Sequence, residues 1–432
     1  MLLDFASLPN PVLAVMEALR FDRRSSDRLR GIPVEQWPAL LAWCDDRQVT
    51  LLLHELHGDE LPQPIRERIS LNRANYARRF ARMESELGEV VDALDRHGIE
   101  FALLKGISHA PALTPEPILR AQGDIDLWFE PASIEEARRI LAGSGYMPAR
   151  NRATDQGRRH LAPMIRPSEW KWRGDMFDPE MPVQIEIHYQ LWNGGAEFIR
   201  MPGQADFWDR RVNRSFNGRI IPVLAPPDLL AFAALHFLLH LLHGDLPLQR
   251  VWEIAFFLHE NADNDDFWSR WRQLHSPALR SLEALVFAIA NVWFNCDVHE
   301  SVRLEANSLA ADVRVWLDHF ALSPLKQRNE PNKDELWLHL ALIPSARARF
   351  RVLLRRLLPV FSGRKLSRSR FAHHGRTFMP SLLGGLEWQR LKRQARHSTE
   401  PALPRHSASP RSLRRASDPR SSSAPIPHAR FE

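Results

Sequence analysis

The chain has 432 residues, of which 44% are hydrophobic and 25% charged, an ordinary balance for a soluble globular protein of two or three domains. Its two cysteines, Cys44 and Cys296, lie far apart, which argues against a disulfide framework or a cysteine-ligated zinc site and favours a reducing, cytoplasmic compartment. The net charge of +6 arises in residues 361–432, which hold 15 Lys/Arg against 4 Asp/Glu and leave the remainder at −5, so overall basicity does not indicate nucleic-acid binding.

Residues 1–97 are predicted to form an N-terminal helical region. The first residues include an acid at Asp4 and no basic start, so no signal peptide is expected. Apolar residues recur at three- and four-residue steps over Val34–Leu56, and a charge-laced helical pattern covers Ile65–His97. Gly98 is a plausible end for this second helix.

Residues 98–222 mix strand and helix patterns, which predicts a domain with a small mixed sheet. The expected strands are Ile99–Leu104, Asp124–Phe129 and Val183–Tyr189, and the expected helices are Gly106–Leu113 and Ile134–Leu141. The fold class is therefore predicted to be α+β, with helical regions on both sides of the sheet domain.

Residues 223–360 are predicted to form a C-terminal helical domain. The expected helices are Asp228–Leu242, Leu248–His259, Phe267–Leu274, Ala278–Trp293 and Leu336–Leu358. The longest strongly apolar run, Leu229–Leu242, is too short to cross a bilayer, and no membrane span is expected. Residues 361–432 are rich in Ser, Arg and Pro and are predicted to be a largely disordered basic tail.

The first chemical pattern is Asp124-Ile125-Asp126-Leu127. Alternate residues of a strand face the same side, so the two aspartates are expected to point together while Ile125 and Leu127 enter the core. Two adjacent carboxylates repel each other, and a divalent cation between them removes the repulsion. Alone, this pattern more often marks a solvated acidic strand face.

The second pattern is the alternating strand around Glu186, on which Gln184 and His188 share the same face. A neighbouring strand would place Glu186 beside the two aspartates and supply the third carboxylate that a two-metal site needs. The alternative interpretation is a polar strand face without ligands.

The third pattern is Lys105-Gly106, where an apolar strand runs into a turn before a short helix. Glycine permits a tight turn, and exposed backbone N–H groups can hold phosphate with added charge from Lys105. An ordinary strand-to-helix turn is the alternative. Arg120 is expected either to bind a phosphate or to pair with a carboxylate.

Three histidines, His236, His240 and His243, are spaced to share one face of a predicted helix. A zinc site would need a further ligand, and no HExxH glutamate follows His236. Packing histidines or histidines that line a cleft are the favoured interpretation.

Taken together, the order of these patterns resembles the DNA polymerase β-like nucleotidyltransferase superfamily, and most closely a bacterial branch described as uncharacterised nucleotidyltransferases. The resemblance covers roughly residues 34–258. The residues that carry it are Leu104-Lys105-Gly106, Arg120, Gly123-Asp124-Ile125-Asp126-Leu127 and Glu186-Ile187-His188. Two departures stand out: Lys-Gly replaces the Gly-Ser usual in the superfamily, and Glu253 stands where the family often has Asp.

The resemblance implies catalytic and metal-binding carboxylates at Asp124, Asp126 and Glu186, with Mg²⁺ or Mn²⁺ as cofactor. It implies a nucleoside triphosphate donor bound by Lys105, Gly106, Arg120 and His188. The expected activity is nucleoside monophosphate transfer to an unknown acceptor hydroxyl on a small molecule, peptide or protein, with pyrophosphate released. The alternatives are an RNA-directed, toxin-like enzyme that uses the basic tail, and a non-catalytic binding module.

Overall fold

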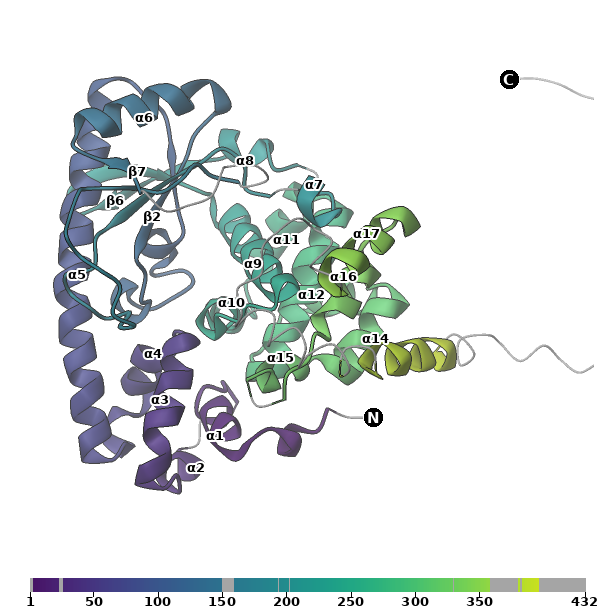
Figure 1. Cartoon of the computed structure of the whole chain (residues 1–432). Helices are drawn as coiled ribbons and strands as arrows, with labels where there is room; N and C mark the ends of the chain where they lie inside the picture. Colours follow the sequence, from purple (N-terminus) through teal and green to yellow (C-terminus); the bar gives the residue numbers. More distant parts are fainter. Residues whose placement is uncertain are drawn as a thin grey trace, which may run out of the picture.

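The α+β prediction is confirmed by a computed structural model of the chain, in which a mixed sheet lies between an N-terminal and a C-terminal set of helices (Figure 1). The residues that the structure describes are 3–22, 26–149, 159–192, 194–201, 203–328, 330–357, 380 and 383–395. The sheet and the C-terminal helices lie side by side, with α5 along the outer side of the sheet.

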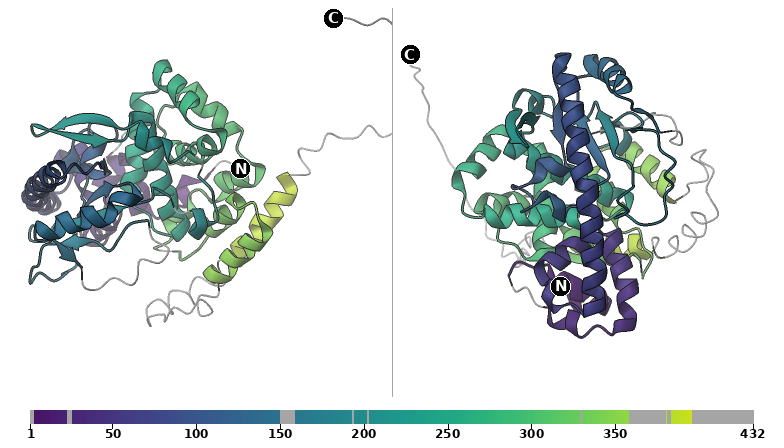
Figure 2. Two further views of the ribbon diagram at one scale, coloured as in Figure 1. Left: turned by 90° about the horizontal axis from the view of Figure 1, so that it is seen from above. Right: turned by 90° about the vertical axis from the view of Figure 1, so that its left-hand side faces the viewer.

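The N-terminal region is helical, as predicted. Its helices are α1 (Asn10–Ala18), α2 (Asp27–Arg30), α3 (Trp37–Asp46), α4 (Thr50–His57) and α5 (Gln63–Arg96). Helix α5 has 34 residues and therefore extends about 50 Å, which carries it from the other N-terminal helices to the sheet (Figure 2). It buries a stripe at three- and four-residue steps, and it ends before Gly98, whose φ is +65°.

The continuous pattern over Val34–Leu56 forms two helices instead of one, because the chain reverses at Gln48, whose φ is +62°. Contacts with the C-terminal helical region stabilise this reversal of the chain. The carbonyl of Arg47 accepts a hydrogen bond from the Gln249 backbone N–H at 3.2 Å, and its guanidinium donates to the carbonyl of Leu246 at 3.2 Å. The local spacing of apolar residues does not indicate contacts with residues so distant in the sequence.

The sheet has seven strands in the order β3-β4-β5-β2-β1-β7-β6. The strands are β1 (Ala102–Leu104), β2 (Asp124–Trp128), β3 (Met147–Pro148), β4 (Met164–Ile165), β5 (Gln184–His188), β6 (Val212–Phe216) and β7 (Arg219–Val223). The three predicted strands are the central β1, β2 and β5. Helix α6 (Ile134–Gly143) packs against α5 beside this sheet.

The β6–β7 hairpin was not predicted, although its turn carries a strong signal. Asn217 and Gly218 occupy the turn with φ of +47° and +77°, and Phe216 pairs with Arg219 across it. Asn-Gly is the residue pair that a two-residue hairpin turn of this kind favours. Both strands carry arginine and lack a strong apolar alternation in sequence, and β6 is largely exposed, so the hairpin was missed.

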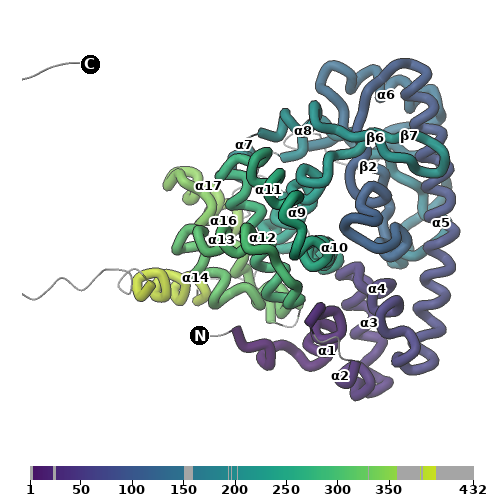
Figure 3. Tube along the Cα trace, turned by 180° about the vertical axis from the view of Figure 1, so that it is seen from behind, coloured from purple at the N-terminus to yellow at the C-terminus, as the bar shows by residue number. Residues whose placement is uncertain are grey.

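Helices dominate the rest of the chain (Figure 3). They are α7 (Gly194–Glu197), α8 (Asp206–Asp209), α9 (Pro226–His243), α10 (Leu248–Glu260), α11 (Asp265–Leu274), α12 (Pro277–Phe294), α13 (Glu300–Asn307), α14 (Ala311–Phe320), α15 (Ser323–Lys326), α16 (Glu335–Leu342) and α17 (Ala346–Leu357). The predicted helix Leu336–Leu358 is divided, because Pro344 interrupts it between α16 and α17. Helices α13 and α14 were not predicted.

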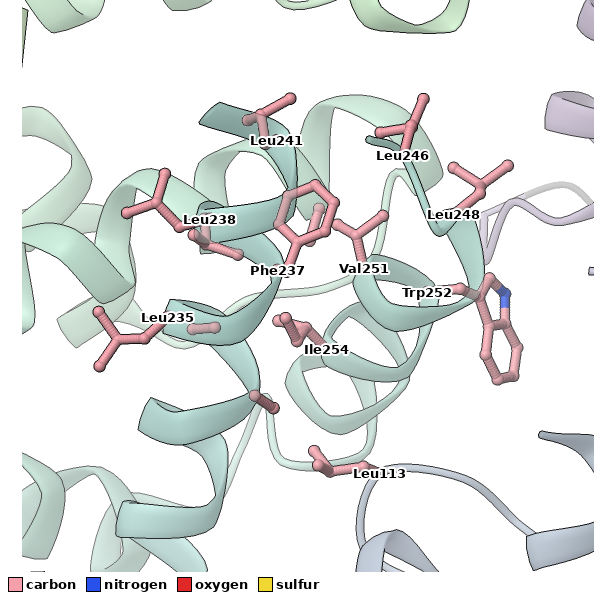
Figure 4. Packing of buried hydrophobic residues seen from close by; sticks show 14 of the residues in the cluster. Leu113, Leu235, Phe237, Leu238, Leu241, Leu246, Leu248, Val251, Trp252 and Ile254 are labelled. Atoms are coloured by element: carbon pink, nitrogen blue, oxygen red, sulfur yellow. The ribbon is translucent and has the colours of Figure 1, made fainter. Parts of the chain in front are cut away.

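Helices α9 and α10 join the helical domain to the sheet domain. Phe237, Leu241 and Val251 pack between these two helices, and Leu113 from the segment after β1 reaches the same cluster (Figure 4). Burial of such side chains contributes roughly 1.5–3 kcal/mol each. The contact fixes α10 beside the loops that follow β1.

Among the described residues, α12 is long and apolar enough to cross a membrane by length and composition alone, with a mean hydropathy of 1.2 over 18 residues. Buried residues make up 61% of that window, and α12 packs against α9, α10 and α13. This is the position of a core helix. The apolar run Leu229–Leu242 is likewise buried within α9.

Part of the predicted tail is ordered against the helical domain. Residues 383–395 are helical, and the indole of Trp388 is 3% exposed and stacks on Trp337 with 5.9 Å between ring centroids. Lys392 forms an ion pair with Asp312 on α14. The predicted disorder does not apply to this stretch, because its tryptophan is buried. Most of the remaining tail lies outside the described residues.

A buried charge cluster in the helical domain predicts a pH-dependent stability. Burial by itself would lower the pKa of His275, but hydrogen bonds to Asp228 at 3.1 Å and Glu283 at 2.9 Å outweigh it and raise the pKa to about 9. Because the pKa rises on folding, protonated His275 stabilises the fold fully below its ordinary pKa of 6.5. We expect about 3 kcal/mol of stability to be lost as pH rises from about 6.5 to about 9.

Melting temperatures at several pH values measure this loss. The matched variant is His275→Gln, which lacks the titrating ring. The difference in melting temperature between wild type and variant should narrow across the same pH window. A difference that stays constant from pH 6.5 to 9 would contradict the assignment to His275.

Candidate active site

Three polar side chains meet on two adjacent parallel strands of the sheet. Strand β2 pairs with β5 so that Asp126 lies beside Glu186 and Trp128 beside His188. Because paired residues of parallel strands point to the same side, the two carboxylates share a face, as predicted. Asp126 is 2% exposed and Glu186 is 7% exposed, and Ile125 is buried on the opposite face.

The Asp126 carboxylate is the centre of a hydrogen-bonded group. Its Oδ1 accepts from Lys105 Nζ at 2.5 Å and from His188 Nε2 at 2.7 Å. His188 Nε2 also lies 3.6 Å from Glu186 Oε2. All four side chains are buried, so these charge-assisted bonds act with little screening by water.

The turn after β1 is tight and strained. Lys105 has φ +54° and ψ −173°, a region almost restricted to glycine, and Gly106 follows with φ +53°. A Cβ on Gly106 would lie 1.8 Å from Gln122 Oε1, so the turn closes directly on the segment before β2. The predicted helix Gly106–Leu113 is only a 3-10 turn, Gly106–His109. Lys105 was expected to face phosphate, whereas the structure directs its ammonium to Asp126.

A cleft of about 300 Å³ opens beside these carboxylates. Most of its lining residues come from α5, from β2 and β5 with the segments before them, and from α10, which are far apart in the sequence. They include the acids Asp124 and Glu186 and the arginines Arg79, Arg120 and Arg250. Asp124 is partly exposed in this cleft, while Asp126 is buried deeper behind it.

The side chains offer a donor set suited to a divalent cation. Among the described residues, one ligand atom each from Asp126, Glu186 and His188 lies within 4.8 Å of the others. The predicted set had Asp124 in place of His188; Asp124 lies outside this group and two residues away on the same strand. Two carboxylates with an imidazole could hold a divalent cation, and Asp124 is near enough for the charges of Asp126 and Glu186 to act on it.

The three carboxylates differ in pKa. Burial opposes ionisation of Asp126, yet the Lys105 charge and the His188 hydrogen bond hold its pKa well below the usual range. Burial also opposes ionisation of Glu186, but the bond to His188 helps to lower its pKa. Burial and the neighbouring Asp126 charge raise the pKa of Asp124 to about 6. Asp126 and Glu186 are therefore ionised at neutral pH.

Arg120 pairs with a carboxylate, which was one of its two expected roles, and its side chain also lines the cleft. Its Nη1 lies 3.4 Å from Glu253 Oε2 on α10, and the same oxygen lies 3.0 Å from His109 Nδ1. The three groups are almost fully buried. Glu253 thus holds the segment that carries Arg120 and His109 against α10.

The first two histidines of α9 contact an arginine side chain. Arg250 Nη1 lies 2.6 Å from His236 Nδ1 and 3.0 Å from His240 Nε2, so a guanidinium occupies the space between the rings. Burial, reinforced by the Arg250 charge, lowers the pKa of His236, and burial lowers that of His240 to about 4. His243 instead approaches Glu197 at 3.1 Å. His236 is 6% exposed and stacks on Phe232, and neither of the first two rings is among the residues that line the cleft, so the packing interpretation is the better one.

Three site residues were missed from the sequence: Arg79, Arg250 and His160. Arg79 interrupts the buried stripe of α5 between Tyr76 and Phe80, and a cation within an apolar stripe is a usable signal. His160 Nδ1 lies 3.8 Å from Glu186 Oε2 through an isolated bridge to His188, which no spacing rule indicates. Arg250 reaches the cleft only through the packing of α10.

Comparison with known proteins gives one match. The family described as "Uncharacterised nucleotidyltransferase" matches residues 33–295, well over half of the chain. The matched segment includes every side chain of the site described above. No curated protein and no solved structure matches the chain.

Proposed function

The chain belongs to the uncharacterised nucleotidyltransferase family, and from this membership and the carboxylate site we propose a metal-dependent transfer reaction. A nucleoside monophosphate moves from a nucleoside triphosphate to an acceptor hydroxyl on a small molecule, peptide or protein. The observation that carries the proposal is the in-register placement of Asp126 beside Glu186 at the edge of an arginine-lined cleft.

Asp126, Glu186 and Asp124 are the residues that would hold Mg²⁺ or Mn²⁺, with His188 as a further contact. Such an ion supplies charge neutralisation at the phosphates of the donor. The oxygen-rich donor set and the ionised state of Asp126 and Glu186 support this assignment. Lys105 keeps Asp126 charged and oriented, which makes it a positioning residue here.

The reaction requires one bond to form and one to break. The acceptor hydroxyl oxygen attacks the α-phosphorus, the bridging bond between the α- and β-phosphates breaks, and pyrophosphate leaves with the bonding electrons. Glu186, ionised and partly open to the cleft, accepts the hydroxyl proton. Positioning and charge stabilisation supply most of the rate enhancement.

We also propose that the sheet domain has the DNA polymerase β-like arrangement. A strand that ends in a glycine turn, a DxD strand and a later glutamate strand lie next to one another, in the order β1, β2 and β5. The RNA-directed alternative draws on the Lys-Gly and DxD patterns that toxin-like enzymes share and on the basic tail, whereas residues 1–360 carry a net charge of −5.

Thermal melting with each nucleoside triphosphate, with Mg²⁺ or with chelator, tests the proposal. A ligand present at 100 times its Kd raises the stability of the folded state by about 2.7 kcal/mol. We expect one or more triphosphates to raise the melting temperature only with the metal, and Asp124→Asn/Asp126→Asn to remove the shift. An increase in melting temperature that occurs without metal, or that remains in Asp124→Asn/Asp126→Asn, would reject the proposal.

A further inference from the structure

Among the described residues, the guanidinium of Arg250 lines the cleft without a direct ion pair, although Asp124, Glu253 and Asp126 act on its charge from a greater distance. It lines the cleft together with Asp124 and Glu186, yet no carboxylate of the described residues lies within 4.0 Å of it. Its Nη1 contacts the rings of His236 and His240, and its buried Nε has no hydrogen-bond partner. The contacts orient the cation but do not neutralise it.

This arrangement is costly for the folded protein. Burial is the main cause that lowers the pKa of Arg250, to about 10, and the like charge of Arg120 adds to it, whereas the charges of Asp124, Glu253 and Asp126 oppose the shift. The rings of His236 and His240 stay neutral because burial lowers their pKa values. A buried cation whose acidic neighbours do not contact it directly still loses solvation by water, and an anion bound at the guanidinium would offset that loss.

Arg79, on helix α5, is a second buried arginine that lines this cleft. It is 2% exposed, and its Nη groups donate to the backbone carbonyls of Met176 and Gln122, each at 2.6 Å. Its Nε is also buried without a partner, and no carboxylate of the described residues forms an ion pair with it. Two guanidinium groups with unused donors therefore line the same cleft.

We propose that Arg250, with Arg79 and Arg120 around it, binds the polyphosphate part of the donor nucleotide. The inference rests on the proposed transfer function and assigns its phosphate-binding side chains to three separate parts of the chain. Guanidinium groups suit this task, since their planar donors match phosphate oxygens and stay charged at neutral pH.

The test uses inorganic tripolyphosphate as the probe and the full chain. The background is Asp124→Asn/Asp126→Asn in chelator, which removes metal bridging and most carboxylate repulsion. Adding Arg250→Gln to this background should weaken tripolyphosphate binding by about tenfold or more, measured by calorimetric titration. Arg250→Lys keeps the positive charge but loses the planar set of N–H donors. Its tripolyphosphate affinity should therefore lie between those of the background protein and the Arg250→Gln variant.

The matched control is Arg270→Gln, which removes an exposed arginine from α11 and should leave the affinity unchanged. The melting temperature without ligand checks the fold. Loss of an arginine from a buried ion pair would lower this temperature strongly, whereas Arg250→Gln should not. Equal affinity for tripolyphosphate with and without Arg250 would overturn the inference. So would an absence of tripolyphosphate binding to the background protein.

The inference and the transfer function fail in different ways. Mg²⁺-dependent nucleotide binding that Arg250→Gln leaves unchanged would overturn the inference and keep the transfer. Conversely, Arg250-dependent tripolyphosphate binding without any Mg²⁺-dependent nucleotide binding would reject the transfer and keep Arg250 as an anion site.

Discussion

Replacing Asp126 by asparagine is expected to lower nucleotidyl transfer by about 1000-fold or more. Asp126 combines a lowered pKa, a central place among the possible metal ligands and bonds to both Lys105 and His188. A bound divalent ion contributes several kcal/mol of transition-state stabilisation, which corresponds to a rate factor of this size. Transfer of label from α-³²P nucleotide into a metabolite extract measures the loss.

Binding of Mn²⁺, followed by the paramagnetic resonance of the free ion, separates metal loss from other damage. The variant should bind Mn²⁺ at least about tenfold more weakly. The matched control is Glu130→Gln, which removes an exposed acid just after the same strand and should change neither quantity. Wild-type Mn²⁺ affinity and transfer in Asp126→Asn would contradict the assigned role.

Replacing Glu253 by glutamine is expected to destabilise the protein by about 3–5 kcal/mol. The carboxylate is 1% exposed and holds Arg120 at 3.4 Å and His109 at 3.0 Å, so its loss leaves a buried arginine without its counter-ion. Breaking one side of a buried pair has a cost of this size. Urea unfolding with unchanged slope measures the free energy of unfolding.

Glu260→Gln is the matched control, since Glu260 is exposed at the end of the same helix α10. Its effect should stay within about 0.5 kcal/mol. Glu253→Asp, the residue usual in the resembling family, should retain more stability than Glu253→Gln. Equal stabilities of Glu253→Gln and wild type would show that Arg120 needs no carboxylate there.

Elements with a strong period could be predicted from the sequence, and those set by distant contacts could not. Strands β2 and β5 alternate cleanly because one face is buried, and α5, α9 and α12 carry sustained apolar steps. The break at Gln48 depends on bonds from the C-terminal helices to Arg47, which local periodicity does not contain. The Asn217-Gly218 turn was visible but lay between weakly patterned strands.

For the site, the sequence indicated which residues carry charge but not their partners. The pairing of Asp126 with Glu186 follows from strand alternation plus one assumption about neighbouring strands, and the structure bears it out. The turn of Lys105 toward Asp126 depends on the strained backbone after β1. Arg79 and Arg250 enter the cleft from helices 171 positions apart, so only tertiary packing reveals them.

The most direct test of the account is anomalous diffraction at the manganese edge from crystals grown with Mn²⁺ and a non-hydrolysable nucleoside triphosphate. The account predicts an anomalous peak in contact with the carboxylates of Asp126 and Glu186. A triphosphate bound with manganese elsewhere, or a well-ordered site with no peak at these carboxylates, would contradict it.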